Sequence, residues 1–201
     1  AGWRNGNYDV NRGVSSAEVE TGHIGFYAGT MFAGTQLKAG AAYTHSAVDV
    51  ARAIAIPGFR DELSSSFTAN TAQIFTEISH SFEAAPSMRL EPFVNLAYVN
   101  VDTSGFMESG GDAALASDGG HGDATFTTLG IRGQSQITLN DIDFTLNASL
   151  AWRHGFGGNP QQALRFAEAD TPFTIAGTSV AGDTALLEVG MSAEVSPNTQ
   201  L

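Results

Sequence analysis

Residues 90–106 read LEPFVNLAYVNVDTSGF, and this stretch decides the fold class. From Leu90 to Tyr98 every second residue is apolar or proline, whereas the other register mixes Glu91 and Asn95 with apolar side chains. Such alternation predicts a β-strand, because successive side chains of a strand point to opposite faces. One face of this strand is uniformly apolar and the other carries a carboxylate, so the two faces meet different surroundings.

The same period of two returns in six further stretches of about ten residues, whereas helical periodicity is hard to find. The predicted strands cover residues 23–32, 37–43, 71–82, 90–101, 127–137, 143–152 and 184–195. Short connections are predicted near residues 33–35, 83–87, 140–141 and 196–199, and long ones near 5–20, 49–66, 102–123 and 155–183. Up-and-down strands with short turns at one end and long loops at the other are typical of bacterial outer-membrane barrels.

The composition excludes several classes of protein. A net charge of −12 argues against nucleic-acid binding, which needs clustered Lys and Arg. Cysteine is absent, so a disulfide scaffold, a thiol nucleophile and a Cys-ligated metal are excluded in this chain. No apolar run reaches the roughly 18–20 residues of a transmembrane helix, and the first ten residues have no features of a signal peptide.

Alternation alone leaves open which face of the sheet is the inside. In a soluble barrel or sandwich the apolar face points inward and the polar face meets water. Two features favour a membrane barrel: the polar registers carry few charges, and the apolar registers carry none over the central span of any predicted strand. A third is that Tyr43, Tyr98 and Trp152 fall near the strand ends that lead into the long connections, where an interfacial aromatic girdle belongs.

Seven short motifs carry a family resemblance. They are TAQIFTE at 71–77, the opening stretch at 90–106, ESGGDAALA at 108–116, TTLGIR at 127–132, WRHGFG at 152–157, FTIAG at 173–177 and DTALLEVG at 183–190. In this order and spacing the sequence resembles the C-terminal translocator domain of classical autotransporters, the type V secretion proteins of Gram-negative bacteria. The resemblance extends over nearly the whole chain.

The resemblance implies an all-β fold, an antiparallel up-and-down transmembrane barrel of twelve strands in the bacterial outer membrane. It implies a pore threaded by the end of an N-terminal passenger, which the barrel anchors and, with the barrel-assembly machinery, brings to the cell surface, where the long loops also lie. The motifs match roughly the fourth to the tenth strand, and residues 2–10 resemble the tail of the third strand and the loop after it. We therefore expect residues 1–201 to be part of a single barrel domain, with about seven strands. The first strands, the last two strands, the pore helix and the passenger are expected to be missing from it.

Charged side chains in the polar registers are the candidate functional residues. They are Lys38, Glu77, Glu91, Arg132, Arg153 and Glu188. Facing a lumen, they could form ion pairs that stiffen the wall and contact a threaded segment. The alternative is that each is a solvated lumen residue, since exposed pairs contribute only about 0–1 kcal/mol each. Glu77, Glu91 and Arg153 are the strongest candidates, because they lie within the matched motifs.

No catalytic, metal or cofactor site is predicted. The five histidines form no H-E-x-x-H or other spaced ligand set, and no G-x-S-x-G context supports a Ser-His-Asp hydrolase. The glycines at 110–111 and 119–122 lack the lysine of a phosphate-binding loop, and we expect flexible surface loops there. The sequence therefore predicts a protein without enzymatic activity.

Three functions remain open from the sequence. The first is a translocator barrel, and the second is an outer-membrane barrel that acts as an adhesin or receptor through residues 102–123 and 155–183. The third is a soluble β-barrel that binds a ligand.

Overall fold

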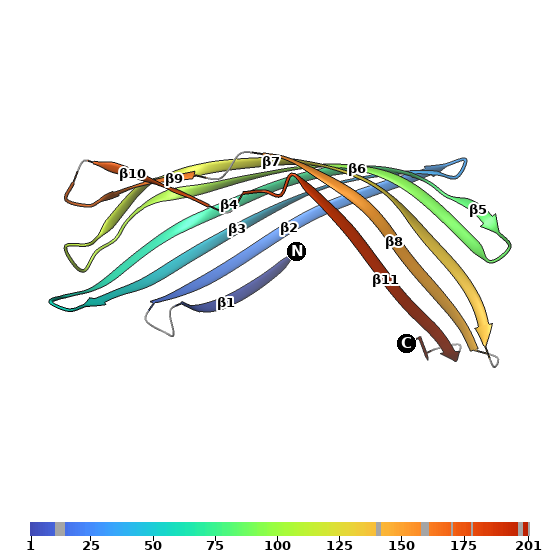
Figure 1. The fold of residues 1–201 in the computed structure, drawn as a ribbon, viewed down its shortest axis with the longest axis horizontal. Helices are drawn as coiled ribbons and strands as arrows, with labels where there is room; N and C mark the ends of the chain where they lie inside the picture. The colour runs from blue at the N-terminus through green and yellow to red at the C-terminus, as the bar shows by residue number, and fades with distance from the viewer. Residues whose placement is uncertain are drawn as a thin grey trace.

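The computed structural model describes residues 1–10, 15–139, 142–157, 161–169, 171–177, 179–196 and 199–200. These residues form one sheet of twelve strands, all of whose pairings are antiparallel (Figure 1). The strands are β1 (Gly2–Val10), β2 (Ser15–Phe32), β3 (Thr35–Ile56), β4 (Phe59–His80), β5 (Phe82–Ala85), β6 (Met88–Met107), β7 (Leu115–Leu139), β8 (Ile142–Gly157), β9 (Gln161–Phe166), β10 (Pro172–Ala176), β11 (Asp183–Ser196) and β12 (Thr199–Gln200). The described residues include no helix that could cross a membrane.

The long strands lie side by side in sequence order, and together they form an arch. The order is β1-β2-β3-β4-β6-β7-β8-β11-β12, while β5 pairs with β6, and β9 pairs with β10 and β7. Figure 1 shows β6 and β7 at the crown of the arch and β1 and β11 descending on its two sides. Within the described residues the sheet does not close, because β1 pairs only with β2, and β11 pairs with β8 and β12. The predicted all-β, up-and-down antiparallel architecture is confirmed.

All seven predicted strands are present. Each lies within one strand, namely β2, β3, β4, β6, β7, β8 and β11, except that residues 81 and 82 fall after the end of β4. The predicted short turn at 33–35 is also confirmed, since Ala33 and Gly34 have φ angles of 49° and 79°, as a two-residue hairpin turn requires. A turn at Pro86 and Ser87 separates β5 from β6. Residues 140–141 and 197–198, where two further turns are predicted, lie outside the described residues.

The predicted long loops are mostly wrong, because the strands continue through them. β1 and β2 stay paired from Gly2–His23 to Val10–Ser15, so residues 2–10 form a strand and not a strand tail with a loop. β3 and β4 stay paired until Ile56 opposite Phe59, and between β6 and β7 only residues 108–114 lie outside strands. The connection at 155–183 contains the β9–β10 hairpin. These stretches are rich in Gly, Ser, Asp, Ala and Pro, which favour loops by composition, although the hydrogen-bond ladder persists through them.

The arch has two chemically distinct faces. Residues paired across neighbouring strands point to the same side, so the pairings sort every long strand into two registers. Phe93, Ala151 and Glu77 share one register and are 8%, 7% and 8% exposed, as expected on the concave face, where side chains converge. The other register is convex and carries large apolar side chains that are strongly exposed, among them Phe26, Leu150 and Val189 at 73%, 58% and 79%.

Candidate pore-lining site

All six predicted pore-lining residues fall in the concave register. Lys38 pairs with Glu77, and Glu77 continues through Asn95 and Thr128 to Arg153. Glu91 pairs with Arg132, which continues through Ser149 to Glu188. The structure thus brings side chains from β3, β4, β6 and β7 together, while Arg153 and Glu188 lie further along the same face.

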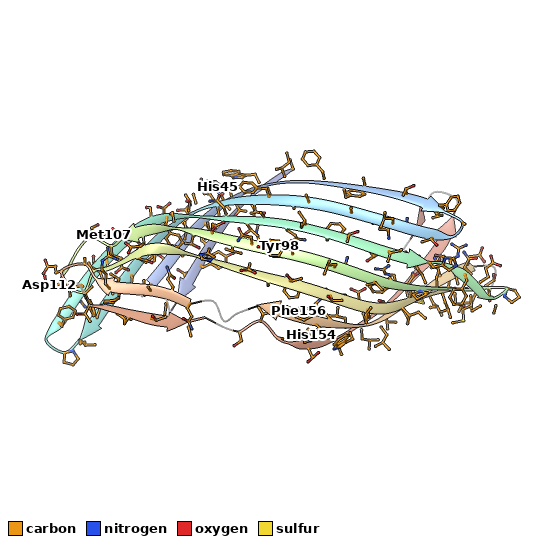
Figure 2. All side chains as sticks on the ribbon, turned by 90° about the horizontal axis from the view of Figure 1, so that it is seen from above. His45, Tyr98, Met107, Asp112, His154 and Phe156 are labelled. Atoms are coloured by element: carbon orange, nitrogen blue, oxygen red, sulfur yellow. The ribbon has the colours of Figure 1, made fainter. Side chains whose placement is uncertain are left out.

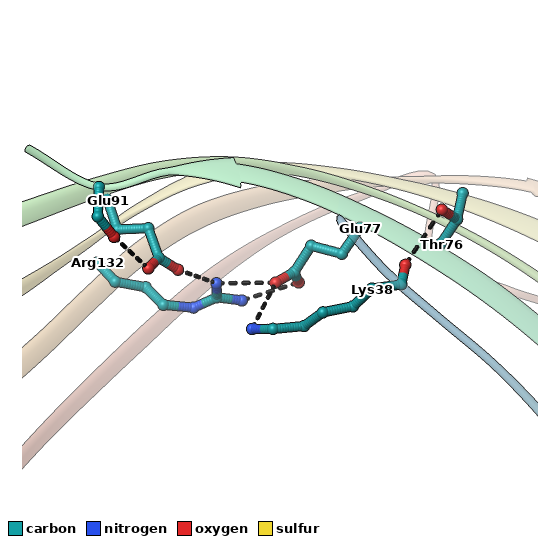
Figure 3. A network of polar contacts seen from close by, with 6 residues as sticks. Lys38, Thr76, Glu77, Glu91 and Arg132 are labelled. Carbon is teal, nitrogen blue, oxygen red and sulfur yellow. Dashed lines mark hydrogen bonds and ion pairs between the residues drawn. The ribbon is translucent and has the colours of Figure 1, made fainter. Parts of the chain in front are cut away.

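Four of the six residues form the charge cluster (Lys38, Glu77, Glu91 and Arg132), which Figure 3 shows on one side of the sheet. Both Nη atoms of Arg132 donate to the two carboxylate oxygens of Glu77 at 2.9 Å, and Nη1 also donates to Oε1 of Glu91 at 2.9 Å. The Lys38 ammonium lies 3.5 Å from Oε1 of Glu77. Two carboxylates thus share two cations, and the cluster is neutral when all four groups are ionised.

The ladder explains why Arg132 joins two acids. Glu91 is its direct partner across the β6–β7 ladder, where paired side chains lie close enough to meet. Glu77 lies one strand further away, opposite Asn95. Only a long side chain with a forked donor group can bind both, and the guanidinium group has this geometry.

Two residues that the sequence does not single out complete the cluster. The Arg132 guanidinium lies over the ring of Phe93, with 3.7 Å between its central carbon and the ring centroid. Ser81, just after β4, donates its hydroxyl to Oε2 of Glu91 at 2.8 Å. The Phe93 ring also covers Gly130, where a Cβ atom would lie 2.6 Å from Cε1 of the ring. Phe93 sits in the opening motif in the same register as Glu91, which is the one signal in the sequence that could have indicated it.

Arg153 and Glu188 are outside the charge cluster. Nε of Arg153 donates to Oγ1 of Thr128 at 3.3 Å, and its guanidinium carbon lies 5.9 Å from the centroid of Phe126. Glu188 is exposed and lines a concave groove of about 540 Å³ together with Glu91 and Arg132. The prediction that Arg153 is one of the strongest candidates therefore gains no support from its contacts, whereas Glu77 and Glu91 lie at the centre of the cluster.

The cluster is open to the concave side. Glu77 is only 8% exposed as a residue, yet the side chains of Lys38 and Arg132 are 39% and 37% exposed. The acids are therefore covered by the sheet and their partners, and the two cations present the accessible surface. No group of three or more His, Cys, Asp or Glu side chains that could hold a metal occurs in the part of the chain that the structure describes.

The three predicted girdle residues lie on the convex face. Tyr43 donates its hydroxyl to Oδ1 of Asn70 at 2.8 Å, and Nε1 of Trp152 donates to Oδ1 of Asp183 at 2.9 Å. Tyr98, labelled in Figure 2, is 39% exposed in the same register. Polar tips with hydrogen-bond partners and exposed rings suit a boundary between an apolar and an aqueous phase.

A second ion pair, which the sequence does not predict, lies in the strand extensions. Nε of Arg52 on β3 donates to Oε1 of Glu108 at 2.9 Å, and Nη2 of Arg52 contacts Oε2 of Glu108. Burial raises the pKa of Glu108, but the hydrogen bonds from Arg52 and the N–H of Leu115 and the charge of Arg52 together lower it by more. The pKa therefore lies below its ordinary value of 4.5. The two residues are 56 positions apart, so no local motif could link them.

Comparisons with known proteins agree with this architecture. The model of the Autotransporter beta-domain family matches residues 1–201. Two proteins of Serratia marcescens, each named extracellular serine protease, are 31% and 30% identical over 188 residues, which is 93% of this chain. The chain spans only 18% of the length of these two relatives.

Proposed function

Because this chain belongs to the autotransporter beta-domain family, we propose that it anchors an N-terminal passenger of its own polypeptide and helps to export it to the cell surface. The role of this family is the translocation of a passenger domain across the outer membrane. The translocator domain is not itself catalytic. The serine protease activity in the relatives' names belongs to whole proteins, of which the matched part is 18%, and any activity here resides in the passenger.

The two faces of the arch carry this proposal. An exposed Val189 or Leu150 in water would form part of an apolar surface far larger than soluble monomers tolerate, whereas hydrocarbon accepts it. The concave face, with its charge cluster, glycines and amides, suits a wet lumen. This distribution is the reverse of a soluble barrel, so it argues against a soluble ligand-binding domain.

The sheet needs further strands to be viable in a bilayer. Unpaired backbone groups at an open edge cost several kcal/mol each in hydrocarbon, and only closed barrels avoid them. We infer that the wall opposite the arch comes from strands outside these 201 residues, and that the barrel-assembly machinery inserts the complete domain.

The charge cluster has two roles in this proposal. Its ion pairs join β3, β4, β6 and β7 across the concave face and so stiffen the wall. Its exposed cations, Lys38 and Arg132, are placed to contact a segment that threads the lumen. Arg153 and Glu188 extend this lining as solvated residues.

The orientation follows from the two ends of the strands. The short turns at Ala33 and Pro86 suit the periplasmic side, and the long extensions of β3–β4 and β6–β7 suit the cell surface. Tyr43, Tyr98 and Trp152 then belong to the girdle at the outer interface, with lipid as their partner.

Protease shaving of whole cells tests the proposal. Cells that express the full-length protein are treated with an external protease, and the passenger and the barrel are followed with separate antibodies. We expect the passenger to be digested or already released, while the barrel stays in the outer-membrane fraction and changes gel mobility on heating. A barrel that remains soluble without detergent would contradict the membrane assignment, and a passenger that stays protected would contradict translocation.

A further inference from the structure

Most of the motif ESGGDAALA lies outside the strands that carry the charge cluster, although it is one of the family motifs in the sequence. Its first seven residues, 108–114, connect β6 to β7 and are called the strut below. The strut lies beside β4, because Ser64 and Ser109 exchange two backbone hydrogen bonds of 2.9 Å. The backbone N–H of Ala113 donates to Oδ2 of Asp61 at 2.8 Å. Figure 2 labels Asp112 at the end of the sheet that is remote from β5.

The two glycines of the strut allow this close approach, and residues 110–111 lie outside the strands, as the predicted loop does. Gly110 has a φ of 120°, which side chains rarely adopt, and a Cβ there would meet the carbonyl oxygen of Glu62. A Cβ on Gly111 would meet the carboxylate of Asp61. The two glycines therefore allow the strut to pack closely against β4. Residues 119–122, the other predicted flexible loop, lie within β7.

The Arg52–Glu108 pair ties the two ends of the strut to β3. Arg52 binds the Glu108 carboxylate with Nε and Nη2, and Nη2 also donates to the carbonyl of Ala113 at 3.0 Å. Oε2 of Glu108 accepts the backbone N–H of Leu115 at 2.9 Å. Glu108 is 7% exposed, so water does not replace these contacts easily. One guanidinium and one carboxylate thus hold both the start and the end of the strut.

The other side of the strut holds the β9–β10 hairpin. The N–H of Ala167 donates to the carbonyl of Ala114 at 2.7 Å, and Leu115 and Ala116 pair with Phe166 and Arg165. Ala114 and Ala116 are 6% and 1% exposed, as is appropriate for a packed joint. Among the described residues, β9 pairs only with β10 and with these first residues of β7, so the joint fixes where the hairpin lies.

We propose that the strut is a positioning device, in which Arg52 and Glu108 hold the β9–β10 hairpin at the extracellular end of the barrel. The hairpin forms one wall of a cavity of about 640 Å³, and Val99 and Val101 of the concave register form the other. By fixing the hairpin, the Arg52–Glu108 ion pair sets the shape of this end of the lumen. The orientation of this end rests on the proposed function, whereas the mechanical link does not depend on the passenger.

The chain offers a matched control. Arg165 of β9 also forms a direct ion pair with Asp118 of β7, with 3.0 Å between Nη1 and Oδ1. The Asp118 side chain is 86% exposed, and exposed pairs contribute little. If the strut positions the hairpin, the remote and less exposed Arg52–Glu108 pair matters to β9 more than this direct exposed pair does.

Hydrogen exchange followed by mass spectrometry tests this inference on the full-length protein in detergent. For E108Q we expect exchange in Gln161–Phe166 to accelerate by at least about tenfold, because a buried charge partner is lost. Exchange in residues 71–80 of the barrel wall should stay unchanged, as should all exchange in D118N. A folded E108Q protein with unchanged exchange in β9, or a D118N protein with an equal increase, would overturn the inference.

Asp61→Ala provides a second variant if E108Q does not fold. It removes the acceptor of the Ala113 N–H without leaving a charge unpaired, and the same increase in β9 exchange is expected. A folded D61A protein whose β9 exchanges as in the wild type would also contradict the strut. Because exchange is measured on the barrel itself, failure of the inference is distinguishable from failure of passenger export.

Discussion

Replacement of Arg132 by methionine tests the charge cluster most sharply. The change removes three hydrogen bonds of 2.9 Å and leaves the carboxylates of Glu77 and Glu91 on one face without their shared partner. Hydrogen bonds to charged groups contribute about 1.5–3 kcal/mol each when buried, and solvated ion pairs about 0–1 kcal/mol. Because Glu77 is 8% exposed but the Arg132 side chain is 37% exposed, we expect an intermediate loss of about 2–4 kcal/mol.

The assay is the temperature at which the folded barrel loses its characteristic gel mobility. For a domain of about this size, 1 kcal/mol corresponds to roughly 2–4 °C, so R132M should lower the midpoint by about 4–16 °C. R132K keeps the charge but loses the forked geometry, and its midpoint should lie between those of R132M and the wild type. E188Q is the matched control on the same face and should change the midpoint by less than about 1 °C. An R132M midpoint equal to that of E188Q would refute the cluster as a stabilising element.

Three further predictions concern other parts of the molecule. V189R places a charge on the convex face. A charge at a lipid-facing site costs about 2–4 kcal/mol, whereas one at a water-facing site costs almost nothing, so we expect V189R to lower the folding yield in bilayers. G130A should destabilise the barrel by about 1–3 kcal/mol, because its Cβ would meet Phe93, whereas G190A, whose Cβ would have no neighbour within 4 Å, should be near neutral in the same heat assay. The pKa of Glu108 is lowered in the folded state, so its contribution is present above about pH 4.5 and is lost as the pH falls through the folded pKa. The protection of β9 from exchange should therefore decrease in the wild type once the pH is lowered below 4.5, whereas in E108Q it should not change with pH.

The strands of the barrel wall could be predicted from the sequence because the two faces of the wall meet different surroundings. Leu90, Val94 and Leu96 alternate with Glu91 and Asn95 for a physical reason, namely that one face meets an apolar phase. The same alternation sorts all six predicted lining residues onto one face, as the strand pairings require. The face on which a side chain lies depends only on whether its position in the strand is odd or even, and a single sequence shows this.

Contacts between strands could not be predicted in the same way. That Arg132 binds Glu77, two strands away, depends on the register of two ladders and on the length of one side chain. Arg153 belongs to the same register and is no less charged, yet its neighbours are Thr128 and Phe126. Selecting the members of the cluster therefore needs the register, which turns and bulges fix and composition does not.

The extensions were missed for another reason. The β3–β4 ladder continues to Ile56, and the burial of residues 59–67 still alternates between the two faces, but the sequence of residues 49–66 mixes Asp, Arg and Glu with apolar residues. Glycine and serine in this region and in the strut favour a loop by composition alone. In the structure, the glycines at 110 and 111 lie where the strut comes closest to β4.

The central claim is that the convex face meets lipid and the concave face meets a lumen, and adjacent residues of one strand test it directly. Leu150 and Ser149 lie on opposite faces of β8, and this chain contains no cysteine, so a fluorophore can be attached to L150C or S149C separately. The full-length protein is reconstituted in bilayers that contain nitroxide-labelled lipid, and quenching is compared for the two positions. We predict strong quenching at position 150 and little at position 149. Equal quenching at the two positions, or stronger quenching at 149, would contradict the account.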